Sequence, residues 1–158
     1  MLRWVMKLAS TRAGGWFFIT VAPPIDRALL RLSKGRISTG GVAPILLLTT
    51  TGAKSGQPRS TPLLYLKDGE RFALIASKGG NPRHPAWYHN LRAKPEATLL
   101  VGGRELHCKA HEAEGEERAR LWKQASEYNP GYDTYQRRAS NRRIPVMVLT
   151  PSDAGSRV

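Results

Sequence analysis

The sequence predicts an α+β domain built on a largely antiparallel β-sheet that closes into a small barrel. About six short apolar segments are separated by glycine, proline and other turn residues, a pattern typical of strands. Most of the connections between them are short enough to be hairpins, which join antiparallel neighbours. Amphipathic segments lie between the strands and flank the sheet as helices. A closed barrel is expected because it buries two such hairpins and removes their edges.

The first half of the chain contains one expected helix and three expected strands. Residues 23–36 are expected to form a helix that two prolines open, an apolar stripe of Leu29, Leu30 and Leu32 anchors, and Gly35 ends. The strands are expected at residues 44–50, 59–66 and 71–76. The sequence KDGE joins the last two, and its Asp-Gly pair is a strong hairpin signal.

The second half alternates helices, loops and strands. After a loop at 77–85 rich in glycine and proline, residues 86–95 are expected to form a short helix that Pro95 ends. A hairpin about Gly102-Gly103 follows at 96–112, and a helix at 114–128. Residues 129–141 are expected to form a loop with at most one helical turn, and residues 143–151 the last strand. The helix at 114–128 has acids in its first turn, and Leu121 and Trp122 are expected to point inward.

The length of 158 residues suits one domain with a hydrophobic core. We expect this main domain at 41–158, preceded by a helical lead-in at 1–40. The apolar stretch GGWFFITVAPP at 14–24 is too short to span a bilayer. Basic residues and a tryptophan precede this stretch, and another tryptophan lies within it. The stretch is therefore expected either to pack on the core or to lie on an anionic membrane surface. The lead-in is expected to be partly disordered.

The charge balance is strongly basic, with 25 Lys+Arg against 12 Asp+Glu and a formal net charge of +13. Such a charge attracts polyanions, which include nucleic acid, acidic lipid and a polyphosphate or polycarboxylate ligand. A merely soluble basic surface is the alternative. Basic and aromatic residues do not interleave as they do in nucleic-acid stacking platforms, so we expect no nucleic-acid partner.

Cysteine and histidine usage argues against a metal centre. Cys108 is the single cysteine, which excludes an intramolecular disulfide and a thiolate cluster and fits a reducing cytoplasm. His107 and His111 share a face but have no carboxylate at ligand spacing, so no metal is expected. The sequence also has no GxSxG motif and no paired-carboxylate signature. Any chemistry is therefore expected to be carried by an organic cofactor.

The stretch TTTGAKSGQPRSTP at 49–62 is the first candidate site. It connects two strands, yet it holds Lys54, Arg59 and several hydroxyls. The N–H groups of Gly52 and Gly56 are expected to approach an anion closely, because no Cβ intervenes. The motif GxxxxGK[ST] is not satisfied, so a nucleotide P-loop is not indicated. The stretch predicts an anion cradle for a cofactor phosphate, with a solvated polar hairpin as the alternative.

The stretch SKGGNPRHPAWYHNL at 77–91 is the second candidate. Ser77 and Lys78 leave a strand, and Gly79 and Gly80 allow the backbone to approach a flat ring. The helix that follows can face negative charge with its N-terminus. Core packing is the alternative role for its two leading aromatic residues.

The third candidate is YNPGYDTYQRR at 128–138. Its tyrosines, Tyr128, Tyr132 and Tyr135, are expected to wall a pocket for an aromatic or quinoid substrate and to offer a phenol hydrogen bond. An ordinary surface loop is the alternative.

Together these segments resemble the deazaflavin-dependent nitroreductase and quinone reductase family, which uses reduced coenzyme F420. TTTGAKSGQPR, ASKGG, PAWYHNL and IPVMVLTP occur in the family's order and spacing, and the match runs from Leu46 to Pro151. The resemblance implies a split β-barrel similar to the FMN-binding fold. It also implies that a hydride passes from reduced coenzyme F420 to a quinone, a nitro compound or another conjugated electrophile.

The resemblance implies roles for individual residues. The cofactor-binding residues would be Lys54, Ser55, Gln57, Arg59, Ser77, Lys78, Gly79, Ala86, Trp87, Tyr88, Asn90 and Leu91. Lys54 and Arg59 would hold the phosphate and the acidic tail, and Ser77, Lys78 and Gly79 would line the ring. The acceptor would face Tyr65, Ser77, Tyr132 and Tyr135, with Tyr132 and Ser77 as the catalytic residues. The proton would come from solvent or from a phenol, with Tyr132 the favoured donor. Asn129 replaces a tyrosine of some members, which implies a more polar or more open acceptor pocket.

Two other functional interpretations of the sequence remain open. The first is an FMN- or haem-binding barrel of the same broad fold. The second is a non-catalytic basic protein that carries a cofactor or binds nucleic acid or a membrane surface. The expected partner is a small-molecule electron acceptor, with the protein a monomer or homodimer in the cytoplasm, peripheral on the inner face of the cell membrane if the lead-in binds lipid.

Overall fold

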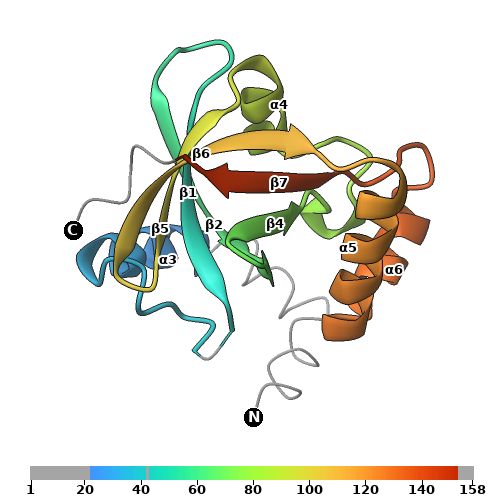
Figure 1. The fold of residues 1–158 in the computed structure, drawn as a ribbon, viewed down its shortest axis with the longest axis horizontal. Helices are drawn as coiled ribbons and strands as arrows, with labels where there is room; N and C mark the ends of the chain where they lie inside the picture. The colour runs from blue at the N-terminus through green and yellow to red at the C-terminus, as the bar shows by residue number, and fades with distance from the viewer. Residues whose placement is uncertain (1–21, 42, 153–158) are drawn as a thin grey trace.

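The computed structural model describes residues 22–41 and 43–152, in which helices flank a curled sheet (Figure 1). The elements in chain order are α3 (Ala22–Leu32), β1 (Ile45–Thr51), β2 (Pro58–Leu64), β3 (Leu66–Asp68), β4 (Arg71–Ile75), the 3-10 turn η1 (Lys78–Gly80), α4 (Ala86–Ala93), β5 (Glu96–Val101), β6 (Arg104–Glu112), α5 (Gly115–Tyr128), α6 (Gly131–Arg138) and β7 (Val146–Pro151). The membrane-surface prediction rests mainly on residues 1–21, which lie outside the described residues.

The described strands form one antiparallel sheet in the order β2-β1-β5-β6-β7-β4-β3. Its two edge strands, β2 and β3, are consecutive in the chain and are separated only by Tyr65. The sheet therefore curls until one bent segment provides both edges. The predicted strand at 59–66 is divided into β2 and β3 at this bend. The predicted barrel is closed by the covalent chain at the bend, because no ladder of hydrogen bonds joins the two edge strands of the described sheet.

Both predicted hairpin turns are present. Val101 pairs with Arg104 across Gly102-Gly103, whose φ angles of 57° and 82° give the left-handed turn that the strand twist favours. Asp68 pairs with Arg71 across the KDGE turn, where Gly69 has a φ of 60°. The turn residues therefore fix the register of both hairpins, as the sequence predicts.

Two hydrophobic cores lie on opposite faces of the sheet. Strand residues alternate between them: Phe72 and Leu74 of β4 belong to the first core, and Ala73 and Ile75 to the second. The first core fills the inside of the curled sheet, where α4 contributes Trp87, Tyr88 and Leu91. This packing places the first turn of α4 at the rim of the barrel.

The second core is covered by α5 and α6, which lie together at one side of the sheet (Figure 1). The sequence prediction of a loop at 129–141 is wrong, because residues 131–138 form α6. Local propensity there is weak, and tertiary contacts decide the conformation. Tyr132 is only 6% exposed, and Asp133 accepts hydrogen bonds from Trp122 Nε1 at 3.1 Å and Ser126 Oγ at 2.8 Å.

Helix α3 packs on β1, β2 and β5, on the side opposite α5 and α6 (Figure 1). Leu30 is buried, but Leu32 is 85% exposed and does not belong to the predicted apolar stripe. The end of the helix approaches the β5–β6 turn: Gly102 N–H donates to Gly35 O at 3.0 Å, and Gly103 N–H donates to Lys34 O at 2.6 Å. Within the described part of the predicted lead-in, α3 thus contacts the barrel directly. The division at residue 40 stays a prediction.

Within residues 22–41 and 43–152, no helix has both the length and the apolar character needed to cross a bilayer.

Replacing Gly35 with alanine should lower the free energy of unfolding far more than replacing Gly69. Both have positive φ angles, of 79° and 60°, so each alanine costs roughly 1–2 kcal/mol in the left-handed region. A Cβ on Gly35 would also lie 2.6 Å from Val101 N, whereas one on Gly69 meets nothing within 4 Å. Overpacking adds roughly 1–3 kcal/mol for Gly35→Ala. Urea unfolding of the two variants measures this difference, and equal losses would contradict the docking of α3 through Gly35.

Candidate functional site

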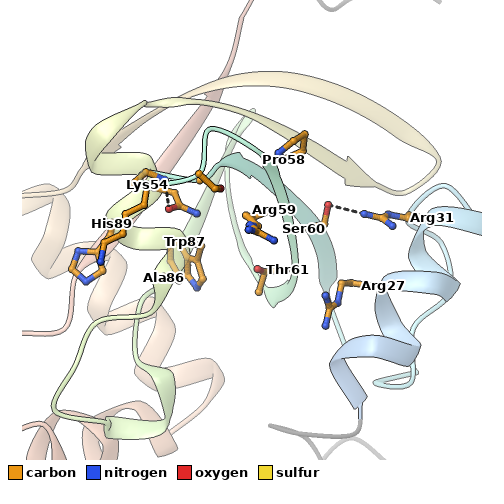
Figure 2. A pocket seen from close by; sticks show the side chains of 14 residues that line it. Arg27, Arg31, Lys54, Pro58, Arg59, Ser60, Thr61, Ala86, Trp87 and His89 are labelled. Carbon is orange, nitrogen blue, oxygen red and sulfur yellow. Dashed lines mark hydrogen bonds between the residues drawn. The ribbon is translucent and has the colours of Figure 1, made fainter.

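A cavity of about 900 Å³ lies at the outer edge strand, between β2, the β1–β2 turn, α4 and α3 (Figure 2). The turn contributes residues 52–55, β2 contributes 58–61, and α4 contributes its first turn. Helix α3 forms the opposite wall with Arg27 and Arg31. The first candidate stretch and part of the second therefore meet at one site.

The β1–β2 turn is closed by its own backbone. Gly52 N–H donates to Gln57 O and Gly56 N–H donates to Gly52 O, both at 2.8 Å. The prediction that these two N–H groups approach an anion is therefore wrong, because the turn uses them to close itself. Gly56 has a φ of 66°, and Ser55 Oγ accepts from Gln57 N–H at 3.2 Å. The turn holds the exposed side chain of Lys54 at the mouth of the cavity.

Asn90 ties this turn to α4. Its side chain is 7% exposed, and its Oδ1 accepts from Ala53 N–H at 2.9 Å while its Nδ2 donates to Thr50 Oγ1 at 3.0 Å. The amide thus satisfies one backbone group of the turn and one hydroxyl of β1 at the same time. Asn90 lines the cavity as expected, and it also fixes the turn relative to the helix.

Four cationic side chains line the cavity: Arg27, Arg31, Lys54 and Arg59. Arg59 lies on the same face of β2 as Thr61, and Figure 2 shows both between α4 and α3. Ser60 faces α3, where its Oγ accepts from Arg31 Nη2 at 3.1 Å and lies 2.9 Å from Thr49 Oγ1. No acidic residue is among the described residues that line the cavity. The site is therefore a concentrated positive surface suited to a ligand with more than one negative group.

The two arginines of α3 were not among the residues that the sequence indicates for this site. Arg27 and Arg31 are four residues apart, so they share one face of the helix. That spacing is visible in the sequence, but it does not reveal which strand the face approaches. The contact of α3 with β2 supplies this information.

The remaining residues of the second candidate divide between the cavity and the core. Ala86 and Trp87 line the cavity, whereas Leu91 belongs to the first core. Tyr88 Oη donates to Glu112 Oε2 at 2.9 Å, and burial, with Glu112 nearby, raises the pKa of this phenol. Gln57, from the first candidate stretch, is exposed and does not line the cavity. Tyr88 and Leu91 therefore support α4 from inside the barrel.

Ser77, Lys78 and Gly79 also lie outside the lining of this cavity, in the loop that leads to α4. This loop packs on α6. A Cβ on Gly80 would lie 2.8 Å from both Tyr135 O and the Cβ of Arg138, so only glycine fits there. The structure thus brings the loop of the second candidate against the helix that carries the third.

The three acceptor-facing tyrosines are not brought together. Tyr65 packs on the first core, with its ring centroid 5.4 Å from that of Phe72. Tyr132 is in the second core, where its ring centroid lies 6.1 Å from that of Tyr135. Burial, followed by the neighbouring tyrosines, strongly raises the pKa of the Tyr132 phenol above its ordinary value. Asn129 Oδ1 accepts from Gly131 N–H at 3.0 Å at the start of α6.

The chain is similar in sequence to the members of one protein family. The F420H(2)-dependent quinone reductase family matches residues 26–151. An F420H(2)-dependent quinone reductase of Mycobacterium tuberculosis is 46% identical over 128 residues, which are 78% of this chain and 85% of that protein.

Among solved structures, an F420-H2 dependent reductase (FDR-A) has a TM-score of 0.62 at 46% identity, over 67% of this chain and 93% of that one. A domain-swapped dimer has a TM-score of 0.63 at 41% identity, over 80% and 96%. The haem storage protein HutZ of Vibrio cholerae, at 12% identity, has a TM-score of 0.54 over 71% and 84% of the two chains, and shares the fold alone.

Asn90→Ala should lower the free energy of unfolding and release the β1–β2 turn. The change leaves the buried Thr50 Oγ1 without its partner, at roughly 1–3 kcal/mol, and frees the N–H of Ala53, an exposed residue whose amide water can reach. Hydrogen exchange at the Ala53 amide should therefore become faster. Asn141→Ala makes the same change at an exposed site and should alter stability by less than about 0.5 kcal/mol. Unchanged exchange at Ala53 in the Asn90 variant would contradict the positioning role.

Proposed function

The chain belongs to the F420H(2)-dependent quinone reductase family, and we propose that its cationic cavity holds the phosphate and the acidic tail of coenzyme F420. The protein is accordingly an oxidoreductase that uses this cofactor in its reduced form. The observation that carries the proposal is the convergence of four cationic side chains on one cavity without a lining carboxylate.

The residues fit such a ligand in charge and in size. The tail of coenzyme F420 is a phosphodiester followed by glutamates, so it needs several cations along an open groove. Lys54 and Arg59 stand on the turn and strand side, and the arginines of α3 stand opposite. A guanidinium recognises phosphate and carboxylate through paired N–H donors, which makes arginine the suitable residue for both parts of the tail. A volume of about 900 Å³ is typical of a large small-molecule site.

We place the ring of the cofactor beside the start of α4, beyond the tail site. Ala86 and Trp87 border the cavity at that end, and the loop at 76–81 precedes α4 in the chain. Gly79 and Gly80 of this loop carry no side chain, so its backbone can lie against a flat ring. When bound, the reduced cofactor supplies a hydride to the acceptor. The residues then have to hold the two reactants close together and in the correct orientation.

The acceptor side is proposed to lie toward α6. Tyr135 is half-buried and its backbone contacts Gly80, which places it next to the ring loop. The Tyr132 phenol is neutral at physiological pH, as an unperturbed phenol also is, and this is the form that can donate a proton to a reduced oxygen, although its raised pKa makes it a weaker acid. Quinones are the acceptor class that the family supports, with nitro compounds and other conjugated electrophiles as further candidates. Tyr65, on the opposite core, is proposed to contribute only at the barrel rim.

The family supports the reductase reading over the FMN- or haem-binding and the non-catalytic alternatives. A solved structure similar to this chain at 41% identity is a domain-swapped dimer, which favours a homodimer over a monomer here.

Lys54→Ala and Arg59→Ala should each weaken binding of coenzyme F420 and leave the fold intact. Charge-assisted contacts contribute roughly 1.5–3 kcal/mol, so each dissociation constant should rise by about tenfold to a hundredfold. Fluorescence titration with coenzyme F420, with FMN in parallel, measures the effect. Lys109→Ala removes an equal charge from β6, away from the cavity lining, and should change the dissociation constant by less than about twofold. Wild-type affinity in both cavity variants would rule out the tail site.

Tyr132→Phe should lower turnover more than cofactor affinity. The change removes the phenol proton but keeps the ring that packs in the second core. General acid catalysis contributes roughly a hundredfold or more, so kcat with a quinone should fall at least about tenfold. The dissociation constant for the cofactor should stay the same. Equal losses in both quantities would instead assign Tyr132 to the cofactor site.

A further inference from the structure

We propose that Arg142 is a positioning residue that holds the loop at 76–81 in its ring-binding conformation and couples this loop to α6. No sequence motif indicates this residue, because it lies in the connection between α6 and β7. The part of the proposal that concerns the ring rests on the proposed function. The part that concerns the loop depends on the geometry of the protein alone.

The guanidinium of Arg142 donates to four acceptors around the loop. Its Nε bonds Asn81 O at 2.8 Å, its Nη2 bonds Ser77 O at 2.8 Å, and its Nη1 bonds Ala76 O at 3.2 Å. Its Nη1 also lies 3.0 Å from His84 Nδ1. A planar group with five N–H donors can serve four acceptors on several sides at once. No carboxylate pairs with Arg142 among the described residues, so backbone geometry sets its position.

The loop needs such support because its backbone is unusual. Lys78, Gly79 and Gly80 are three consecutive residues with positive φ angles, of 46°, 63° and 81°. The left-handed region is unfavourable for a residue with a Cβ, as Lys78 has. Conformations of this kind persist when the surrounding structure determines them, and they concentrate at functional sites. Arg142 binds the carbonyls on both sides of this run, at Ser77 and at Asn81.

Arg142 is in turn fixed by α6. Its N–H donates to Ala139 O at 2.9 Å, and its carbonyl accepts from Gln136 Nε2 at 2.9 Å. Gln136 Oε1 also accepts from Ile144 N–H at 2.9 Å, so the whole connection is tied to the helix. A displacement of α6, which carries the proposed acceptor tyrosines, is therefore transmitted through Arg142 to the loop beneath the ring.

His84 supplies the one side-chain acceptor of this cluster. Because Arg142 stays protonated, His84 must present an unprotonated Nδ1 to it. Burial, then the charges of Arg142 and His89, lower the pKa of His84, while Glu112 acts in the opposite direction. The imidazole ring also lies on Tyr88, with ring centroids 4.6 Å apart. His84 thus links Arg142 to the first turns of α4, the other wall of the proposed ring site.

The test compares Arg142→Lys and Arg142→Gln with Arg143→Gln. Arg143 is the adjacent arginine and is exposed, so its variant matches the change in charge and the position in the chain. Hydrogen exchange of the cofactor-free proteins is measured over a peptide that covers residues 76–84. The dissociation constant for coenzyme F420 and the kcat with a quinone are then measured on the same samples. Arg142→Lys keeps the charge and removes the planar group of donors, so it separates charge from geometry.

We expect exchange of the Gly80 and Asn81 amides to rise by roughly tenfold or more in both Arg142 variants, and to stay unchanged in Arg143→Gln. We expect kcat to fall by about tenfold or more while the dissociation constant changes less than about threefold, because the tail site is untouched. Unchanged exchange in Arg142→Lys would overturn the proposal. Faster exchange with unchanged kcat in a protein that binds the cofactor would overturn its catalytic part.

Failure of the wild-type protein to bind coenzyme F420 would refute the proposed function instead. In that case the exchange measurement still decides whether Arg142 holds the loop.

Discussion

The bend at Tyr65 is the constraint on which the rest of the site depends. Because one segment supplies both β2 and β3, the sheet ends at β2 with an unpaired strand edge. An exposed edge of this kind is normally covered or charged. Here the inward-facing side chains at its far end are Arg59 and Thr61 rather than leucines, and α4 and α3 stand on either side of them (Figure 2). The cavity therefore lies along the unpaired end of β2.

Four cationic side chains around one cavity repel one another, and their exposure to solvent keeps this repulsion small. Arg27, Arg31, Lys54 and Arg59 are all solvent-exposed, so water screens their mutual repulsion until a ligand arrives. An anion that enters the cavity displaces part of that water and brings compensating charge. Affinity of this kind is most sensitive to the number of negative groups on the ligand and to salt. The excess of basic residues in the composition thus has a specific location in addition to its general effect on the surface.

Much of the fold could be predicted from the sequence, because local signals there are strong. The glycine pair at 102–103 and the KDGE turn set the hairpin registers, and α5 begins and ends within one residue of its predicted bounds. Helix α6 could not be predicted, because its stability comes from the burial of Tyr132 and the bonds of Asp133 rather than from propensity. The position of Lys54 and Arg59 at one site could be predicted from their turn, whereas their role as a cradle stays a prediction. The positions of Arg27, Arg31 and Arg142 could not be predicted, because each is reached through a contact between segments distant in sequence.

Different side chains hold the two halves of the proposed site, which are the β1–β2 turn and the loop at 76–81. Asn90 fixes the turn proposed to bind the tail to the C-terminal half of α4, and Arg142 fixes the loop proposed to bind the ring to α6. Asn90 bonds one main-chain group and one hydroxyl, and Arg142 bonds three carbonyls and the His84 ring, so each acts within its own half of the site. Helix α4 is the element that the two halves share, and its buried face of Trp87, Tyr88 and Leu91 anchors it in the first core. The barrel interior therefore provides a rigid reference for both, while binding strength and reaction geometry can be altered separately.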